Sequence, residues 1–348
     1  MPEVSIVIRC RDEARHLGPV LEAVLAQEGA PAAEVVALDS GSRDGTLALL
    51  ARYPVRVEHL EHFSYGAALN RGAALAQGAL VVYLSAHCRP LGRDWLARLL
   101  FPFAEPQVVA SFGRQVPVPG VNPIEALTTS RNFPPAPPPG VLFSTANGAV
   151  RRAAVLARPF DEEIAIAEDH LWARGAVERI AYVPEAAVAH SHAMSLAVWR
   201  ARFYAHGLAA EYARRRRGIE LPWGEPRDGA ARAFARLVGT LARRGEVRAL
   251  AHLPSYALAR TVWFARGARE GARRYGAADE AAPGQTPDRY SSRVSGERSY
   301  ISSTASSVPI ASSGAVCPRP ATCSLQPPSG ARRLVSIRRS RCETRTYA

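Results

Sequence analysis

The sequence predicts an α/β fold in which a mainly parallel sheet is flanked by helices. Short apolar runs rich in β-branched residues alternate four times with segments of helical period over residues 4–84. The chain has 348 residues, 47% of them hydrophobic and 22% charged, which is enough for one large α/β domain with appendages. Such alternation implies right-handed crossovers, and ligands then gather beyond the carboxyl ends of the strands.

Four strands are expected at residues 4–8, 34–38, 55–59 and 79–84, because each is a short continuous apolar run. The first helix is expected to follow Asp12, a candidate N-cap, and to reach residue 25. Its apolar residues at 17, 20, 21, 24 and 25 have the spacing of an amphipathic helix. Further helices are expected over residues 45–53 and 65–76.

The alternation loosens after residue 84. Helices are expected over residues 93–103 and 167–177, and extended segments over 107–113, 180–183 and 187–190. The proline-rich segment 117–140 is expected to be an ordered loop over the site or a mobile lid, and the sequence does not separate these two. Beyond Ser195 the chain is helical and arginine-rich through residue 217, and again over 230–275.

These patterns divide the chain into an α/β domain over residues 1–194, a helical extension over 195–282 and a tail over 283–348. The formal charge is +13, and all basic residues are arginine. The tail holds ten arginines against three acidic residues, with fourteen serines and no amphipathic period, so it is expected to be disordered. Arginine suits phosphate ligands, but genomic base composition gives the same bias.

Several classes of protein are excluded. No run of eighteen apolar residues exists to span a bilayer, and residues 1–8 lack the pattern of a signal peptide, so a cytoplasmic location is expected. Five cysteines without C-x-x-C spacing predict free thiols. Residues 9–16 contain no glycine, which excludes a dinucleotide-binding dehydrogenase. No base-reading motif supports nucleic-acid binding.

Acidic residues follow the second predicted strand, in the segment Asp39-Ser-Gly-Ser-Arg-Asp-Gly-Thr46. A carboxylate at a strand end can accept a hydrogen bond from the imide N–H of uracil or thymine. An ordinary Asx turn with a helix cap explains the same residues, and both interpretations stay open.

Two further clusters carry candidate chemistry. Glu168 and Asp169 precede a helical pattern, and because adjacent helical residues point about 100° apart, only one is expected to face a substrate. The alternative is that both acids stabilise the amino terminus of the helix through its dipole. His190 and His192 share a face of a predicted strand end, where they could hold a metal or contact phosphate, or could be exposed polar residues.

Four segments together resemble the family 2 glycosyltransferases. They are residues 5–13, residues 39–46, Asn70-Arg-Gly72 with Gly78, and Glu168-Asp169, in the order and approximate spacing of that family over residues 4–200. The opening segment and the late His-Ser-His are most similar to the bacterial rhamnosyltransferase-type branch.

The resemblance implies a GT-A fold, a nucleotide-diphosphate sugar bound over the first strands, and an acceptor hydroxyl that attacks the anomeric carbon with inversion. The implied nucleotide-sugar-binding residues are Arg9, Glu13, Asp39, Ser40, Asn70, His87 and Asn147. Among these, Asp39 is expected to pair with the base and Asn147 to contact the sugar. Asp169 is the expected general base, and Glu168 is expected to cap or orient it.

The metal site departs from the family pattern. Ser85-Ala-His-Cys88 stands where most relatives have a D-x-D-type acidic cluster for a divalent ion. His87 could replace a carboxylate as a ligand of Mn²⁺ or Mg²⁺, with His192 as a second ligand, or could meet the diphosphate as a cation. Cys88 is interpreted as packing. A protein that binds nucleotide sugars without turnover is the alternative.

The expected activity is transfer of a sugar from dTDP-rhamnose or a UDP-sugar to a glycan or lipid-linked glycan in cell-surface polysaccharide synthesis. The helical segments 199–204 and 212–217 combine aromatic residues with arginines. Such a surface could lie at the inner face of the cell membrane as a peripheral contact, or could simply be a solvated face.

Overall fold

A computed structural model describes residues 2–136, 143–176, 179–192, 195–221, 230–243, 245 and 250–276. The chain divides into two compact units, 1–305 and 306–348, and all described residues lie in the first. The predicted tail over 283–348 and part of the predicted lid lie outside the described residues.

Eight strands of the described residues form one mixed sheet in the order β3-β2-β1-β4-β7-β6-β8-β5. β1 pairs in parallel with β2 and β4, β2 with β3, and β6 with β8, whereas β7 is antiparallel to β4 and β6, and β5 to β8. The strands are β1 Val4–Cys10, β2 Ala33–Asp39, β3 Arg56–His59, β4 Leu80–Ser85, β5 Arg89–Pro90, β6 Val108–Val116, β7 Asn147–Arg151 and β8 Arg179–Ala189.

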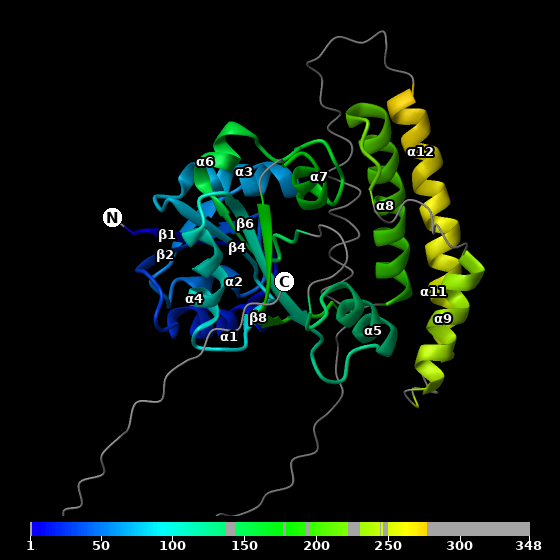
Figure 1. Ribbon diagram of the computed structural model, residues 1–348, viewed down its shortest axis with the longest axis horizontal. Coiled ribbons are helices and arrows are strands. Elements are labelled where there is room, and N and C mark those ends of the chain that lie inside the picture. The colour runs from blue at the N-terminus through cyan, green and yellow to red at the C-terminus, as the bar shows by residue number, and fades with distance from the viewer. Residues whose placement is uncertain are drawn as a thin grey trace, which may run out of the picture. The chain divides into compact units, whose positions relative to one another are not determined.

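Helices lie on both faces of this sheet, and a group of C-terminal helices lies to one side of it (Figure 1). The helices are α1 Ala14–Leu25, α2 Thr46–Leu50, α3 Tyr65–Leu75, α4 Trp95–Leu100, α5 Pro123–Asn132, α6 Arg152–Ala157, α7 Glu168–Arg174, α8 Leu196–Arg217, α9 Ala230–Arg243, α11 Leu253–Leu258 and α12 Phe264–Gly276. A 3₁₀ turn, Phe101–Ala104, follows α4, and a π-helical turn, Ala259–Trp263, joins α11 to α12.

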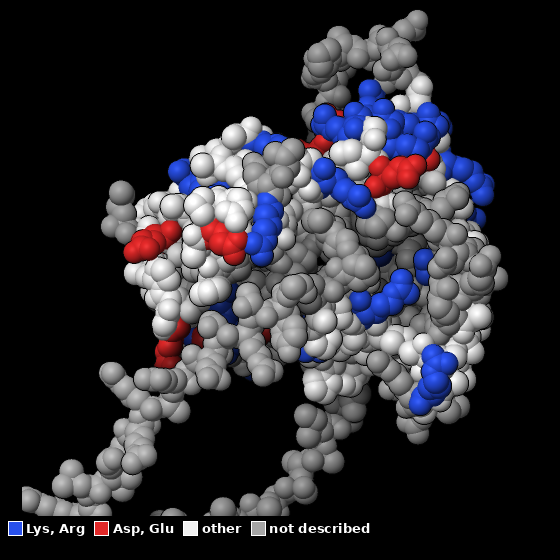
Figure 2. Space-filling model, viewed as in Figure 1, with Lys and Arg blue, Asp and Glu red and all other residues white. Residues whose placement is uncertain are grey.

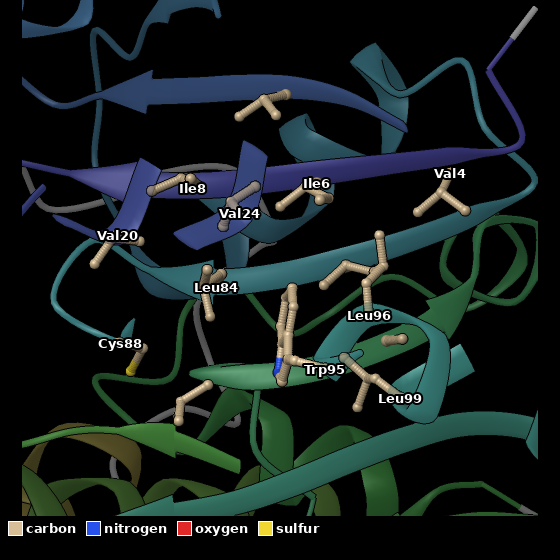
Figure 3. Packing of buried hydrophobic residues seen from close by; sticks show 14 of the residues in the cluster. Val4, Ile6, Ile8, Val20, Val24, Leu84, Cys88, Trp95, Leu96 and Leu99 are labelled. Carbon is tan, nitrogen blue, oxygen red and sulfur yellow. The ribbon is translucent and has the colours of Figure 1, made fainter. Parts of the chain in front are cut away.

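The central strand β1 is buried on both faces, as the apolar run predicts. Ile6 and Ile8 pack in one cluster with residues of α1 and with Trp95 of α4 (Figure 3). Val7 belongs to a second cluster with Leu69 of α3 and Trp172 of α7. Successive residues of β1 therefore hold helices on opposite faces, and the sheet is the middle layer of three.

The four predicted N-terminal strands and three helices are confirmed, with the second helix shorter than expected. The N-cap prediction is wrong. Asp12 has a left-handed backbone with φ of 53°, and its carboxylate accepts hydrogen bonds from the backbone N–H groups of Arg43 and Asp44. Helix α1 begins after Glu13 instead. Asp12 therefore stabilises the loop after β2 and does not cap α1.

Three later elements differ from the prediction. The two expected strands 180–183 and 187–190 are parts of the single strand β8, whose pairing with β6 shifts register between Gly113 and Gln115. Helix α5 lies inside the proline-rich segment, where the Asn122 side chain accepts from the Ile124 N–H and Pro123 occupies the first turn. Strand β7 was not expected, because Asn and Gly at its start weaken a strand pattern.

The C-terminal helices α8 and α12 run in the same direction in close contact (Figure 1). A Cβ atom on Gly267 would lie 2.0 Å from the carbonyl oxygen of Tyr204, so only glycine permits this approach. The Tyr212 hydroxyl donates to Asp161 at 2.9 Å, which joins α8 to the α/β part. In the part of the chain that is described, no helix combines the length and apolar character needed to cross a membrane.

Candidate functional site

Polar residues gather at the carboxyl ends of β1, β2 and β4. Because these strands are parallel neighbours, Cys10 pairs with Asp39 and Arg9 with Ser85 at one edge of the sheet. The loop that follows β4 carries His87. The sequence-predicted residues Arg9, Asp39 and His87 therefore share the edge at which open α/β sheets bind ligands.

Asp39 is 1% exposed and organises the loop that follows β2. Its carboxylate accepts hydrogen bonds from the N–H groups of Gly41 at 3.0 Å and Ser42 at 3.1 Å, and from the Ser42 hydroxyl. The Ser40 N–H and hydroxyl donate to the carbonyl of Cys10. These contacts form the Asx turn expected as one alternative, while base binding by Asp39 and Ser40 stays a prediction.

Arg9 connects β1 to the two predicted catalytic acids. Its Nη1 lies 3.6 Å from Glu168 Oε1, and its Nη2 lies 3.5 Å from the hydroxyl oxygen of Thr145. Thr145 in turn donates its backbone N–H to Asp169 Oδ2 at 3.1 Å. The guanidinium also lies 5.4 Å from the centre of the Tyr65 ring. The structure thus brings Arg9, Glu168 and Asp169 into one network.

A left-handed residue precedes the two acids. Ala167 has φ of 72° and stands immediately before α7, so the backbone turns sharply where Glu168 begins the helix. Glu168 is 4% exposed. Burial and the neighbouring Asp169 raise the pKa of Glu168 to about 8, against the opposing charge of Arg9. At neutral pH Glu168 is therefore mainly protonated and can donate a hydrogen bond.

Three histidines meet near the same edge. The ring centroid of His87 lies 5.1 Å from that of His190 and 5.1 Å from that of His192, and the latter two are 4.6 Å apart. Each ring offers one nitrogen, and the three nitrogens lie within 4.8 Å of one another. The sequence prediction selected His87 and His192 as ligands and omitted His190, although the strand period places His190 and His192 on one face.

Two polar side chains hold these rings. Glu13 Oε1 lies 2.9 Å from His87 Nδ1, and Gln115 Oε1 lies 2.6 Å from His190 Nδ1. Burial, with the nearby positive charges as smaller causes, lowers the pKa of His190 and of His192 well below the usual range. Neutral imidazole is the form that binds metals. Glu13 thus lies beside a candidate metal ligand, and its expected role in nucleotide binding stays a prediction.

Asn147 and Asn70 make contacts inside the protein. Asn147 is fully buried, accepts from the Trp95 indole N–H at 3.0 Å and donates to the Ala186 carbonyl at 2.9 Å. Asn70 donates to the carbonyl of Phe160 and accepts from its N–H, both at 2.9 Å. Asn147 therefore has no exposed surface for a sugar in this structure, and Asn70 holds the segment that leads to α7. Their sugar-binding roles stay predictions.

Residues 5–158 match the model of Glycosyl transferase family 2. This segment of the chain is similar to the family 2 glycosyltransferases. Glycosyltransferase AglE of Haloferax volcanii is 32% identical to this chain over an alignment of 106 positions, which covers 28% of this chain and 34% of AglE. The chain thus spans about a third of the length of this curated relative.

A solved structure shares the fold of this chain. The mannosyltransferase PcManGT from Pyrobaculum calidifontis, in complex with GDP-Man and Mn²⁺, gives a TM-score of 0.51 at 19% identity, over 78% of this chain and 87% of that one. Glucosyl-3-phosphoglycerate synthase from Mycobacterium tuberculosis, with Mn²⁺, UDP and phosphoglyceric acid, gives 0.48 at 18% identity, over 64% and 80%. The PcManGT match confirms the GT-A fold.

The segment that matches the family model holds only part of the candidate site. It includes Arg9, Asp39 and His87, whereas Glu168, Asp169 and the later histidines lie beyond residue 158. Sequence reasoning did not select Thr145 or Gln115. Thr145 stands two residues before Asn147, which the resemblance selects, so its position could have been found. Gln115 gives no sequence signal, because it lies near the end of β6 and acts only through His190.

Proposed function

We propose that this protein transfers a sugar from a nucleotide-diphosphate donor to a hydroxyl of a glycan or lipid-linked glycan, with inversion at the anomeric carbon. The observation that carries this proposal is the network at the sheet edge. There the Thr145 N–H fixes the Asp169 carboxylate at 3.1 Å, next to the pair formed by Arg9 and Glu168. A held carboxylate beside a partly buried cation suits proton removal next to an anionic leaving group.

The proposed step forms a bond between the acceptor oxygen and the anomeric carbon and breaks the bond from that carbon to the diphosphate. The acceptor proton goes to Asp169, and the electron pair of the broken bond leaves with the diphosphate. Arg9 Nη1 is buried and has no hydrogen-bond partner among the described residues, so it can donate to a phosphate oxygen. Protonated Glu168 leaves the charge of Arg9 largely available for that contact.

A divalent cation fits the histidines near this edge. Among the described residues, the Nε2 atoms of His87 and His190 are buried without a hydrogen-bond partner, so both nitrogens are available to bind a metal ion. We propose that His87 and His192 are among the residues that hold the ion. When bound, such an ion neutralises charge that develops on the departing diphosphate. The acidic D-x-D-type cluster is replaced by Ser85-Ala-His-Cys88.

The proposed donor is dTDP-rhamnose, with UDP-sugars next. The support is the resemblance of the opening segment and of His-Ser-His to the rhamnosyltransferase-type branch. A thermal-shift screen over dTDP-, UDP- and GDP-sugars, with and without divalent cation, tests this choice, because a ligand of the native state raises its apparent stability. GDP-mannose belongs in the panel, because PcManGT was solved with it.

The activity itself is tested by donor hydrolysis and by transfer to glycan acceptors. Turnover of the donor that stabilises the protein supports the transferase. Tight donor binding with no turnover, whether metal is absent or Mn²⁺, Mg²⁺, Zn²⁺ or Co²⁺ is added, favours the alternative, a nucleotide-sugar-binding protein without catalysis. Failure of every nucleotide sugar to bind overturns both.

We further propose peripheral contact with the inner face of the cell membrane, where a lipid-linked acceptor would lie. The last turn of α8 carries four arginines, at 214–217, and the last turn of α12 carries Arg273 and Arg274. Glu211, Glu270 and Asp161 pair with some of these arginines, and because six arginines face three acids a net positive charge remains at this end of the two helices. Figure 2 shows blue side chains concentrated there. Each basic contact with an anionic leaflet contributes about 1 kcal/mol.

Co-sedimentation with vesicles tests the membrane contact. We expect binding to vesicles that contain phosphatidylglycerol, loss of binding at high salt, and none to pure phosphatidylcholine. Replacement of Arg216 and Arg217 by glutamine should weaken binding more than replacement of Arg89 and Arg93, which lie in the α/β part. Equal binding to both kinds of vesicle would contradict the proposal.

A further inference from the structure

The three histidines of the cluster come from two distant parts of the chain. His87 lies in the loop after β4, and His190 and His192 lie just beyond β8. Their candidate ligand nitrogens are within 4.8 Å of one another. Two nitrogens on one tetrahedral ion, with metal–nitrogen bonds of about 2.0–2.1 Å, are roughly 3.4 Å apart. Small ring rotations therefore bring the three nitrogens to one ion.

The partners of two rings fix which nitrogen is free. The Glu13 carboxylate only accepts hydrogen bonds, so His87 Nδ1 carries the proton that it shares at 2.9 Å. Gln115 donates its Nε2 to the Ser144 hydroxyl at 2.9 Å, which directs its Oε1 toward His190 Nδ1. In both rings the lone pair is left on Nε2.

These Nε2 atoms have no other use in the described part of the chain. Both are buried, and neither has a hydrogen-bond partner there. A buried imidazole lone pair without a partner is destabilising, and a metal ion satisfies it. In known metal sites a histidine ligand usually donates its Nδ1–H to a carboxylate or carbonyl oxygen and binds the metal through Nε2. His87 and His190 have this arrangement.

We infer that His87, His190 and His192 form a three-imidazole site that selects Zn²⁺, Co²⁺ or Ni²⁺ over Mn²⁺ and Mg²⁺. Imidazole favours the later first-row ions, whereas Mn²⁺ and Mg²⁺ favour the oxygen ligands that this set lacks. Glu13 supplies no ligand, because its oxygen binds His87. Three protein ligands leave a position open for a diphosphate oxygen, and this consequence rests on the proposed function.

A titration of the full chain with Co²⁺ tests the site without any donor. The protein is first treated with a chelator and dialysed. We expect one equivalent of Co²⁺ to give visible absorption bands of a nitrogen-ligated ion, which one equivalent of Zn²⁺ abolishes. A 100-fold excess of Mn²⁺ or Mg²⁺ should leave the bands in place.

Single variants identify the ligands. His87→Ala, His190→Ala and His192→Ala should each weaken Co²⁺ binding by more than 100-fold, whereas the exposed His252→Ala should bind as the wild type does. Glu13→Leu removes the acceptor of the His87 Nδ1–H and should weaken binding by about 10-fold to 100-fold, the usual effect of a lost second partner. This milder variant keeps the test valid if an alanine variant fails to fold.

Two results overturn the inference. The first is wild-type Co²⁺ affinity in the His190→Ala variant, and the second is displacement of Co²⁺ by equimolar Mn²⁺ or Mg²⁺. The outcome is distinguishable from that of the proposed function. If the protein binds Co²⁺ but turns over no donor, the metal site is supported and the proposed function is not. If the protein transfers a sugar but binds no Co²⁺, the proposed function is supported and the metal site is not.

Discussion

Arg9 Nη1 lies 3.6 Å from Glu168 Oε1, with the two side chains 12% and 5% exposed. This buried contact joins the carboxyl end of β1 to the first residue of α7. A carboxyl group whose pKa is raised to about 8 is mainly neutral at pH 7, so the contact is not a fully charged ion pair there. Arg9 thereby keeps a positive charge at the sheet edge.

Glu168 should make the stability of the protein fall as pH rises. Its folded pKa is raised to about 8 from 4.5, so the folded state binds more protons than the unfolded state between these values. The stabilisation is full below pH 4.5 and is lost as pH rises through 8. Glu168→Gln, which cannot ionise, should remove this dependence and gain stability relative to the wild type by a few kcal/mol, since one pKa unit is about 1.4 kcal/mol.

Urea denaturation of the wild type and of Glu168→Gln at pH 5, 6, 7 and 8 measures that difference. Groups common to both proteins cancel in it. Glu105→Gln is a suitable control, because Glu105 is exposed. A difference between wild type and Glu168→Gln that stays constant from pH 5 to pH 8 would mean that the carboxyl does not titrate in this range.

Asp169→Asn should lower kcat by about 10² to 10⁴, because the amide cannot accept the acceptor proton. Its side-chain oxygen can still accept the N–H of Thr145, so the local fold and the affinity for the donor should change little. Steady-state rates and donor binding by calorimetry separate the two effects. Asp94→Asn, an exposed acid before α4, should behave as the wild type does. Unchanged turnover in Asp169→Asn would remove Asp169 as the base.

The parallel half of the sheet could be predicted because Ile6, Val7 and Ile8 form an apolar run that only a doubly buried strand needs. Strand β7 could not, because Asn147 is a polar residue whose side-chain partners, Trp95 of α4, Arg114 of β6 and Ala186 of β8, come from distant parts of the chain. The local sequence pattern therefore predicts β1, whereas β7 depends on hydrogen bonds between residues that are far apart in the chain.

The candidate site shows the same division. Asp169 and His87 stand in recognisable positions, so the sequence selects them. Gln115 and Thr145 act through other residues, at distances along the chain that no local pattern encodes. Glu13 belongs to a family-like segment, yet its contact is with His87, and only the fold brings the loop after β4 beside it.

Gly267→Ala should destabilise the packing of α12 on α8. The added Cβ would lie 2.0 Å from the Tyr204 carbonyl oxygen, and the backbone of α8 has to move to accept it. Overpacking of this kind costs about 1–3 kcal/mol, more than the helix propensity gained. Gly45→Ala is the matched control, because its Cβ would meet only Ala14 Cβ at 3.6 Å, an ordinary contact.

Thermal and urea unfolding of the two variants test this prediction, with far-UV circular dichroism to confirm that helix content is retained. A Gly267→Ala protein as stable as Gly45→Ala would show that α8 and α12 are less tightly apposed than the structure has them.

Arg9→Lys should weaken donor binding by about tenfold although the charge is kept. The guanidinium reaches Glu168 and Thr145 with two different nitrogens at 3.6 and 3.5 Å, and a lysine ammonium cannot span both and still meet a phosphate oxygen. Calorimetry with the nucleotide-diphosphate sugar found in the screen measures the change, and the exposed Arg15→Lys should show none. Equal affinity in Arg9→Lys and wild type would mean that only the charge at this position matters, so that the fork geometry of Arg9 has no part in holding the diphosphate.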